Sequence, residues 1–352
     1  MDKVLIAMSG GVDSSAAAWI LKEKGLDCVG AMMKLYEGEG GCCSLADAED
    51  ARSVAFRLGI PFNVFNFTGD FTEQVIDRFI CAYQNGATPN PCIDCNRYLK
   101  FDRFLRRADE IECKYIATGH YAQIEQDENG RWLLKKGLDS SKDQSYVLYT
   151  MTQEQLSRTL LPLGGMEKSE VRKVAVEQGF INADKKDSQD ICFAPDGDYA
   201  GVIEEHTGAK AEKGFFKDRA GNVLGEHKGI IHYTVGQRKG LGIGGNAEPL
   251  YVCEVCPQSN TVILGGNDEL YSKTLIANDV NLISVDRIDE PIRVNAKIRY
   301  RHAEQHATVW QIDDDTIKVE FDEPQRAITK GQAVVLYDGD MVVGGGTIVS
   351  SE

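Results

Sequence analysis

The stretch VLIAMSGGVDSSAAAWILKEKG, residues 4–25, decides the fold of this chain. Residues 4–8 are an apolar run that predicts a buried strand, and residues 13–24 have a helical pattern that ends at Gly25. The same alternation of short strands and helices continues at residues 28–33, 45–58, 61–65, 70–84, 96–110 and 115–118. We therefore predict an α/β fold with a doubly wound parallel sheet, in which ligands bind at the carboxyl ends of the strands.

The turn between the first strand and the first helix has the sequence SGGVDSS, residues 9–15. Paired glycines let the backbone turn closely around a phosphate, serines offer hydroxyl groups, and the helix N-terminus supplies unpaired N–H groups. The turn lacks the lysine of a Walker A loop, so we do not expect transfer of a γ-phosphate. Asp13 is a candidate Mg²⁺ ligand because hard cations prefer carboxylate oxygens. An ordinary serine cap beside a glycine turn is the alternative interpretation.

Near residue 200 the sequence pattern changes from alternating strands and helices to short strands and glycine turns. Strand patterns near 291–300, 305–312, 315–320, 332–337 and 341–349 predict a small antiparallel β-barrel. We predict three domains, with bounds at residues 1–200, 201–275 and 276–352.

Charge and composition exclude several classes of protein. The chain has 39 basic and 54 acidic residues and a net charge of −15, which argues against coating of nucleic acid through bulk charge. We see neither a signal peptide nor a stretch of membrane-spanning length, so we expect a cytoplasmic protein with no membrane partner. In that compartment thiols stay reduced, and the ten cysteines are core residues, metal ligands or catalysts.

Two cysteines are candidates for chemistry. Cys95 follows the proline-stiffened loop 88–94 and precedes the helix predicted from residue 96, where a helix dipole lowers the pKa of a thiol. Cys192 ends the polar stretch 186–191. For each, a small buried hydrophobic residue is the alternative interpretation.

The remaining cysteines give weaker signals. Cys253 and Cys256 form a C-x-x-C pair within a strand-like run without a second pair at zinc spacing, which favours ordinary sheet positions. Cys42 and Cys43 lie in a glycine-rich loop whose role the sequence leaves open. Core positions are predicted for Cys28, Cys81 and Cys113.

Several strings occur together and in order along nearly the whole chain. They are SGGVDSS, the pair Met33-Lys34, TPNP-x-x-x-CN with Lys100-Phe101, ATGHY at 117–121, KDQSYVLY at 142–149, the D-S-x-x-I-C-F block at 187–193, GQRKGLGIGG at 236–245 and the closing GGGTI. SGGVDSS resembles the pyrophosphate loop of ATP pyrophosphatases that adenylate a substrate oxygen. The full set resembles the tRNA-specific 2-thiouridylases, the MnmA family.

The resemblance implies a two-step reaction on a wobble uridine of tRNA. The C2 oxygen of the base attacks the α-phosphate of ATP, and a persulfide then delivers sulfur to C2 while AMP leaves. It further implies that Cys192 carries the persulfide and that Cys95 releases the sulfur by forming a disulfide, with an upstream protein as sulfur donor. Residues 1–200 would be the catalytic domain, and residues 276–352 would contact tRNA.

The same positional match assigns binding residues. ATP would be held by Ala7, Met8, Ser9, Gly10, Gly11, Val12, Asp13, Ser14, Met33 and Gly119. The target base would be met by Asn90, Pro91 and Cys92, and the tRNA by His120, Lys142, Asp143, Gln144, Arg299, Tyr300 and Gln332. A catalytic base or a surface hydrogen-bonding group are alternative roles for His120.

One position departs from the family pattern. Cys92 stands where the common form of the loop has aspartate, so Cys92, Cys95 and Cys192 together offer three thiolates. Three cysteines are a possible ligand set for a 4Fe-4S cluster with one open iron, in place of a persulfide relay.

Two basic clusters are candidates for local tRNA contacts. The helix predicted at 96–110 has apolar residues at core spacing (Phe101, Phe104, Leu105 and Ala108) and a basic stripe (Lys100, Arg103 and Arg107). A second cluster comprises Arg293, Lys297, Arg299, Arg301 and His302, with Tyr300 among them. Solvated charged faces are the alternative interpretation.

Two other functions are consistent with parts of the sequence. Another adenylating enzyme with the same loop that modifies tRNA explains the phosphate loop. A sulfur carrier or iron–sulfur protein that binds ATP explains the cysteines. Neither explains KDQ at 142–144, GQRKGLGIGG and the barrel together.

Overall fold

The structure is a computed structural model that describes residues 2–36, 44–186, 191–244 and 248–352. The chain divides into two compact units. Unit 1 comprises Met1–Ile76, Pro91–Gly197 and Asp340–Val343, and unit 2 comprises Asp77–Asn90, Asp198–Gly339 and Gly344–Glu352. Within the described ranges, no helix combines the length and apolar character needed to cross a bilayer.

Unit 1 is built on a parallel five-stranded sheet in the order β3-β2-β1-β4-β7. Its strands are β1 (Lys3–Ala7), β2 (Asp27–Lys34), β3 (Phe62–Asn66), β4 (Tyr115–Ala117) and β7 (Thr159–Leu160). The strand order reverses between β1 and β4. The loops that follow these two neighbouring strands therefore leave the carboxyl edge of the sheet in opposite directions, which is where ligands bind in such sheets. The predicted doubly wound sheet is confirmed.

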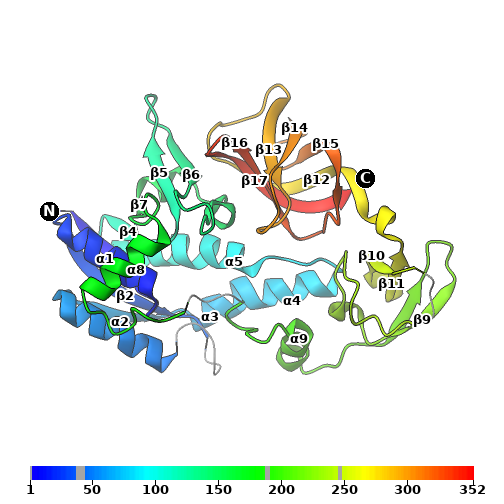
Figure 1. The fold of residues 1–352 in the computed structure, drawn as a ribbon, viewed down its shortest axis with the longest axis horizontal. Coiled ribbons are helices and arrows are strands. Elements are labelled where there is room, and N and C mark those ends of the chain that lie inside the picture. Colours follow the sequence, from blue (N-terminus) through cyan, green and yellow to red (C-terminus); the bar gives the residue numbers. More distant parts are fainter. Residues whose placement is uncertain (1, 37–43, 187–190, 245–247) are drawn as a thin grey trace. The chain divides into compact units, whose positions relative to one another are not determined.

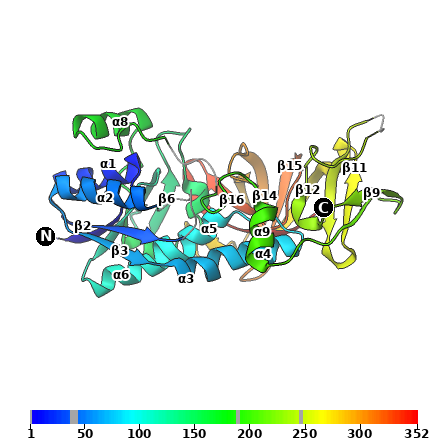
Figure 2. The ribbon, with the colours of Figure 1, turned by 90° about the horizontal axis from the view of Figure 1, so that it is seen from below.

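Helices cover both faces of this sheet (Figure 2). On one face lie α1 (Val12–Glu23), α2 (Leu45–Leu58) and α8 (Lys168–Glu177), and on the other lie α3 (Thr68–Phe71) and α6 (Phe104–Glu110). The alanines of α1 are buried against Val171 and Ala175 of α8 in one core. Small side chains on α1 allow this close approach.

Two helical segments differ from the sequence prediction. The helix predicted at 70–84 contains a π-helical turn, η1 (Thr72–Ile76), between α3 and α4 (Asp77–Gln84). The helix predicted at 96–110 begins earlier, as α5 (Pro91–Asp94), and continues as the π-helical η2 (Cys95–Arg103) into α6. The prediction that Cys95 sits at the helix N-terminus is therefore wrong. Proline is favoured in the first helical turn because it needs no N–H partner there, so Pro91 opens the helix.

A β-hairpin of unit 1 was not predicted. Strands β5 (Ala122–Gln126) and β6 (Trp132–Lys136) pair in antiparallel fashion, and Met341 pairs with Lys135 of β6. Two short helices follow, η3 (Ser145–Leu148) and α7 (Gln153–Ser157).

Unit 2 contains a four-stranded sheet in the order β10-β11-β8-β9. Its strands are β8 (Gly214–Lys217), β9 (Val223–His227), β10 (Tyr251–Cys256) and β11 (Thr261–Gly265), and α9 (Tyr199–Thr207) precedes them. The short helices η4 (Ile230–His232), η5 (Pro257–Ser259) and η6 (Asn267–Leu270) connect these strands. Phe216, Val252 and Val262 are buried in its core.

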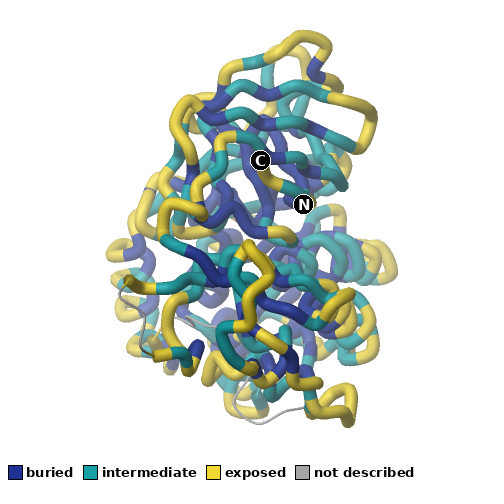
Figure 3. The backbone as a smooth tube through the Cα atoms, turned by 90° about the vertical axis from the view of Figure 1, so that its right-hand side faces the viewer, coloured by how far each residue is buried: buried dark blue, intermediate teal, exposed yellow. Residues whose placement is uncertain are grey.

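Unit 2 also contains a closed six-stranded antiparallel barrel, which confirms the predicted barrel (Figure 1). Its strands are β12 (Tyr271–Leu282), β13 (Ile292–Lys297), β14 (Gln305–Gln311), β15 (Ile317–Arg326), β16 (Ala333–Asp338) and β17 (Met341–Ser351). Pairing of β12 with β17 closes the barrel, and β12 is the strand that the sequence pattern missed. Figure 3 shows the burial pattern along the chain, with exposed residues gathered in the turns and loops.

Candidate active site

The phosphate loop follows β1 and ends at the first turn of α1. Gly11 is the residue that caps α1, and it has no side chain to occupy the helix N-terminus. Ser14 and Ser15 direct their hydroxyls back to the carbonyl oxygen of Gly11, at 3.1 and 3.0 Å, and the Ser9 N–H donates to Ser14 Oγ at 3.2 Å. The serines thus hold the loop shape while the helix N–H groups stay available to an anion.

Two glycines allow neighbouring backbone to pack closely at this loop. Gly10 has a φ of +76°, and a Cβ at this position would overlap the carbonyl oxygen of Asp47. Gly119 follows β4, and a Cβ there would lie 2.9 Å from the Asp13 carbonyl carbon. Both positions require glycine because neighbouring backbone packs directly against them, which fixes the shape of the loop.

A segment far along the chain braces the loop. The Asn182 side-chain amide donates to Gly10 O and to Ser15 Oγ, both at 2.9 Å, and Asn182 is almost fully buried. Its own Oδ1 has no hydrogen-bond partner among the described residues. Asn182 therefore holds the phosphate loop from a segment that precedes Cys192 in the chain.

Lys185 adds a charged brace. Its ammonium reaches Asp47 at 2.5 Å, Asp50 at 2.8 Å and the Gly10 carbonyl at 3.3 Å. Burial opposes the charged state of Lys185, but hydrogen bonds to both carboxylates outweigh it and raise its pKa. Burial likewise opposes ionisation of Asp47, whereas hydrogen bonds from Lys185 and Ser44 prevail and lower its pKa.

Asp13, the candidate Mg²⁺ ligand, is engaged by two neighbours. Lys168 Nζ lies 2.7 and 2.8 Å from its two carboxylate oxygens, and the Tyr121 hydroxyl donates to Oδ1 at 2.7 Å. Sequence analysis missed Lys168, Tyr121, Asn182 and Lys185. Tyr121 lies inside the ATGHY string, whereas the other three carry no local signal because folding alone brings them to the loop.

The remaining ATP candidates are consistent with a nucleotide site. Ala7 ends β1, and Met8 donates its N–H to Ala31 O of β2 at 2.8 Å. Met33 is buried near the end of β2. The open helix N-terminus and the two obligatory glycines fit ATP, and the Asp13 carboxylate fits Mg²⁺ if Lys168 is displaced.

The helix that carries the candidate cysteines starts at Pro91. Cys92 lies in its first turn and is exposed, whereas Cys95, one turn later, is buried. Asn96 is fully buried and donates to the Val147 carbonyl at 3.1 Å, which ties the helix to the 142–149 string.

Cys192 lies in a loop segment of unit 1 and is partly exposed. The next residue, Phe193, packs edge-to-face on Phe71 of α3, with ring centroids 5.9 Å apart. Since α3 also contacts η2, one short helix supports the Cys192 segment and the helix of Cys95. Asp187, Ser188, Gln189 and Asp190 lie outside the described residues.

The three cysteines do not fit a cluster. Across the described part of the chain, no three His, Cys, Asp or Glu side chains are grouped so that they could hold a metal ion. The geometry therefore lends no support to the 4Fe-4S hypothesis, and we derive no step through such a cluster.

Of the other cysteines, Cys42 and Cys43 lie outside the described residues. Cys28 and Cys113 are buried as predicted, and burial raises the pKa of Cys28 to about 11. Cys81 is exposed on α4, so its predicted core position is wrong. Burial raises the pKa of Cys253 and of Cys256 in β10, which favours neutral sheet residues over reactive thiolates.

His120 is buried, and its Nδ1 lies 2.7 Å from Thr118 Oγ1. Burial, with a smaller effect of the Lys100 charge, lowers the pKa of His120 well below its ordinary value. The imidazole is therefore neutral at pH 7, and in this structure it is 8% exposed. A direct tRNA contact would require that it become accessible.

The 142–144 segment organises its own loop. Asp143 accepts hydrogen bonds from the N–H groups of Gly137 and Ser145, at 3.0 and 3.1 Å. Gln144 forms two hydrogen bonds of 2.9 Å with the backbone of Tyr121. Its side-chain oxygen accepts from the Tyr121 N–H, and its own N–H donates to the Tyr121 carbonyl oxygen. Gln144 therefore positions the tyrosine that holds Asp13.

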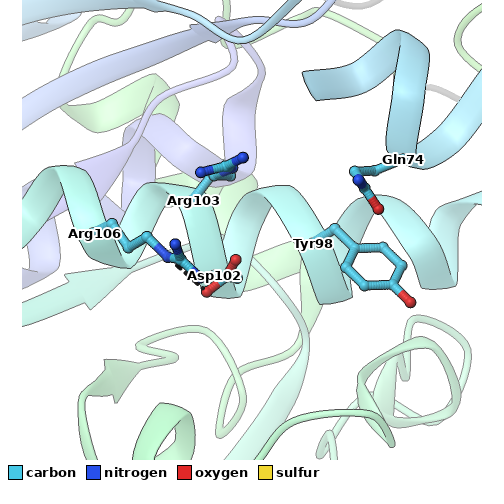
Figure 4. Close-up of a pocket in the computed structure, with 5 residues that line it drawn as sticks. All are labelled: Gln74, Tyr98, Asp102, Arg103 and Arg106. Carbon is cyan, nitrogen blue, oxygen red and sulfur yellow. Dashed lines mark hydrogen bonds and ion pairs between the residues drawn. The ribbon is translucent and has the colours of Figure 1, made fainter. Parts of the chain in front are cut away.

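The helix of Cys95 also carries the predicted basic stripe. The four predicted core residues, Phe101, Phe104, Leu105 and Ala108, are buried, which confirms the helical face. Figure 4 shows a pocket lined by Tyr98, Asp102, Arg103 and Arg106 of this helix and by Gln74 of η1. Arg103 pairs with Asp70 at 2.9 Å and Arg106 with Asp102 at 3.1 Å, so a phosphate there would have to exchange partners with these carboxylates.

The tRNA candidates of unit 2 have structural partners. Arg299 donates to the carbonyl oxygen of Arg326 at 2.6 Å, and Tyr300 is exposed. Gln332 donates to Thr88 O at 2.6 Å, and Thr88 donates its N–H to Lys330 O at 2.8 Å. The segment that contains Asn90 is thereby anchored on the barrel within unit 2.

The site thus defines a class: an α/β nucleotide-binding domain with a phosphate loop, followed by β domains. Three family models match the chain: a tRNA methyl transferase HUP domain at residues 2–196, a tRNA methyl transferase PRC-barrel domain at 200–266 and an aminomethyltransferase beta-barrel domain at 272–348. These descriptions name domains, whereas the full-length relatives name an activity.

Relatives match over almost their whole length. The chain is 56% identical to a tRNA-specific 2-thiouridylase MnmA of Clostridioides difficile over 99% of this chain and 98% of that protein. Proteins of the same name from Lachnoclostridium phytofermentans and Clostridium acetobutylicum are 51% and 52% identical, over 99% and 98% of this chain and 100% and 99% of theirs. The chain belongs to the tRNA-specific 2-thiouridylase family.

Proposed function

We propose that this chain is a tRNA-uridine 2-sulfurtransferase that activates the wobble uridine of tRNA with ATP and replaces its C2 oxygen with sulfur. The observation that carries the proposal is the common support of a phosphate loop and two cysteine segments within unit 1. Asn182 joins the loop to the chain that leads to Cys192, and α3 contacts both cysteine segments. Membership of the family supplies the substrate class.

In the first step the uridine O2 attacks the α-phosphorus of ATP. The O2–P bond forms, the bond from the α-phosphorus to the bridging oxygen breaks, and pyrophosphate leaves. The helix α1 N-terminus and the loop N–H groups bind the phosphates, in a loop whose shape is fixed by backbone packed directly against Gly10 and Gly119. Mg²⁺ supplies charge neutralisation of the phosphates when bound, with Asp13 as its candidate ligand.

In the second step a persulfide on Cys192 attacks C2 through its terminal sulfur, and AMP leaves. Cys95 thiolate then attacks the Cys192 sulfur, which forms the Cys95–Cys192 disulfide and leaves the terminal sulfur on the base. Turnover needs an external thiol to reduce this disulfide and a sulfur-donor protein to form the next persulfide. A buried Cys95 would have to move toward Cys192 in this step.

The proposal extends to the partner and the setting. The basic residues of the Cys95 helix and the exposed Tyr300 of the barrel are candidate contacts for the anticodon region of tRNA. Asn90, Pro91 and Cys92 are proposed to face the extruded base. We place the reaction in the cytoplasm, where tRNA is modified and thiols are kept reduced.

Release of pyrophosphate and incorporation of sulfur test the two steps separately. With tRNA transcript, ATP, a persulfide donor and a thiol reductant, the parent should release pyrophosphate only when tRNA is present. A sulfur carrier would release none, and an adenylating enzyme for small substrates would not depend on tRNA. Nucleoside analysis of the product should show 2-thiouridine.

Cysteine variants separate activation from sulfur transfer. Cys192→Ser should retain tRNA-dependent pyrophosphate release and incorporate no sulfur, because adenylation needs no thiol. Cys81→Ser, at an exposed position on α4, is the matched control and should behave like the parent. Sulfur transfer by Cys192→Ser at the parent rate would refute the persulfide role.

The 4Fe-4S alternative has its own test. Anaerobically purified protein should contain no stoichiometric iron, and Cys92→Ala should keep its sulfur transfer, because the three cysteines do not form a ligand group. Iron and acid-labile sulfide that disappear together in Cys92→Ala would replace the persulfide route by the cluster.

A further inference from the structure

A buried lysine lies against the one carboxylate of the phosphate loop. Lys168 is 8% exposed, and its ammonium spans both carboxylate oxygens of Asp13 at 2.7 and 2.8 Å. The ring of Tyr121 lies 5.7 Å from the same ammonium, and its hydroxyl donates to Asp13. The carboxylate in the first turn of α1 is therefore paired with an ammonium supplied by another helix.

The position of Lys168 is fixed at its backbone. It is the first residue of α8, its N–H donates to the buried carboxylate of Asp139 at 3.1 Å, and Val171 and Ala175 of the same helix are buried against α1. The side chain has little freedom other than to extend over the start of α1. Preorganisation of this kind is what stabilisation of a developing charge requires.

The neighbouring lysine differs in its partners. Lys185 contacts two carboxylates, Asp47 and Asp50, and neither belongs to the phosphate loop. Lys168 is paired with Asp13, the residue best placed to bind a divalent cation that arrives with ATP. If Asp13 held Mg²⁺, the Lys168 ammonium would be available to exchange that carboxylate for the phosphates of ATP.

We propose that Lys168 exchanges Asp13 for the phosphates of ATP and stabilises the pyrophosphate as it leaves. The lysine thus supplies, from a distant position in the same chain, the cation that the SGGVDSS loop lacks. It acts as a hydrogen-bond donor and takes part in no covalent step. The inference rests on the proposed adenylation, and it assigns a role to a residue outside the loop.

Activity of matched variants gives the first test. Lys168→Met should lower tRNA-dependent pyrophosphate release about 100-fold, the usual effect of removing one preorganised donor from a developing anion. Lys168→Arg keeps the charge and should recover most of that loss. Lys173→Met removes an exposed lysine from the same helix and should leave the rate unchanged.

Binding of ATP without tRNA gives the decisive test, since it does not depend on catalysis. Equilibrium binding of ATP is measured in EDTA for Asp13→Asn and for Asp13→Asn with Lys168→Met. The double variant carries neither charge of the ion pair, so folding is not burdened by an unpaired buried group. If Lys168 contacts phosphate, the added Lys168→Met change weakens ATP binding about tenfold or more, as expected for a hydrogen bond to a charged group.

The outcomes are distinct. Equal ATP affinity of the two variants would show that Lys168 only neutralises Asp13, and the proposal would be overturned. Far-UV circular dichroism and thermal unfolding confirm that each variant is folded. A parent that binds ATP and yet releases no pyrophosphate with tRNA would refute the proposed function, while the comparison of ATP affinities would still decide the role of Lys168.

Discussion

The side-chain amide of Asn182 donates a hydrogen bond of 2.9 Å to the carbonyl oxygen of Gly10, which lies 172 positions earlier in the chain. The same amide also donates to Ser15 Oγ. A residue that leads into the Cys192 segment therefore holds the turn that binds phosphate.

Asn182→Ala should destabilise the protein by roughly 1–3 kcal/mol, because the Gly10 carbonyl and the Ser15 hydroxyl lose a buried donor. Urea unfolding of the parent and the variant measures the difference. Asn129→Ala, at an exposed hairpin turn, is the matched control and should change the free energy of unfolding little. Equal stability of Asn182→Ala and the parent would show that this brace contributes nothing.

Gly10→Ala should be costly for two reasons. The φ of +76° disfavours any residue with a Cβ by about 1–3 kcal/mol, and that Cβ would overlap the Asp47 carbonyl oxygen. Gly11→Ala is the matched control, because its φ of −91° is ordinary and its nearest neighbour, Ser9 Oγ, would lie 3.5 Å from the new Cβ. Thermal unfolding should place Gly10→Ala well below Gly11→Ala, and the reverse order would contradict the loop geometry.

Lys185→Met should cost about 2 kcal/mol at pH 7, between the values for exposed and for buried ion pairs. The pKa of Asp47 is lowered from 3.8 in the folded state, so its contribution is present above that value and is lost as pH falls through the folded pKa. The pKa of Lys185 is raised from 10.5, so its contribution is lost only above that value.

The stability difference between parent and Lys185→Met should therefore be constant near neutrality and shrink below about pH 4. Urea unfolding at pH 7 and pH 3.5 provides the comparison, with Lys186→Met, an exposed neighbour, as control. A difference that persists unchanged in acid would mean that packing of the lysine chain, not its charge, carries the effect.

His120 should also make the stability of the protein depend on pH, in a range that begins at higher pH than the range set by Asp47. Because burial lowers its folded pKa well below 6.5, the unfolded state binds a proton first as pH falls. Stability should fall below about pH 6.5 by up to about 1.4 kcal/mol per pH unit from this group. His120→Asn should remove that slope, and an NMR titration of the His120 ring should show no transition between pH 6 and 8. A transition in that range would show that the ring is accessible and available for proton transfer.

Local pattern was sufficient to predict most of the fold. The apolar run before SGGVDSS and the alternation after it predicted the parallel sheet, and short strands with glycine turns predicted the barrel. The hairpin β5–β6 and strand β12 were missed, because half-buried strands without a clear alternation give a weak period. The start of the cysteine helix was placed too late, since Pro91 was interpreted as part of a stiff loop.

The candidate site divides in the same way. Residues of the phosphate loop could be assigned from one contiguous string, because a turn between a strand and a helix is local. The neutral state of His120 and the exposure of Cys81 could not be assigned, since burial depends on which elements pack around a side chain.

The sequence by itself determined the candidate phosphate loop, because such a loop needs glycines and serines at fixed spacing and residues 9–15 supply them. Only the tertiary structure decided what surrounds the cradle. Lys168, Asn182 and Lys185 reach it from segments more than 130 residues away, with separations of 155, 172 and 175 positions in the bonds to Asp13 and Gly10. Contacts across such separations depend on the packing of α8 and the following segment against α1, and no local pattern encodes them.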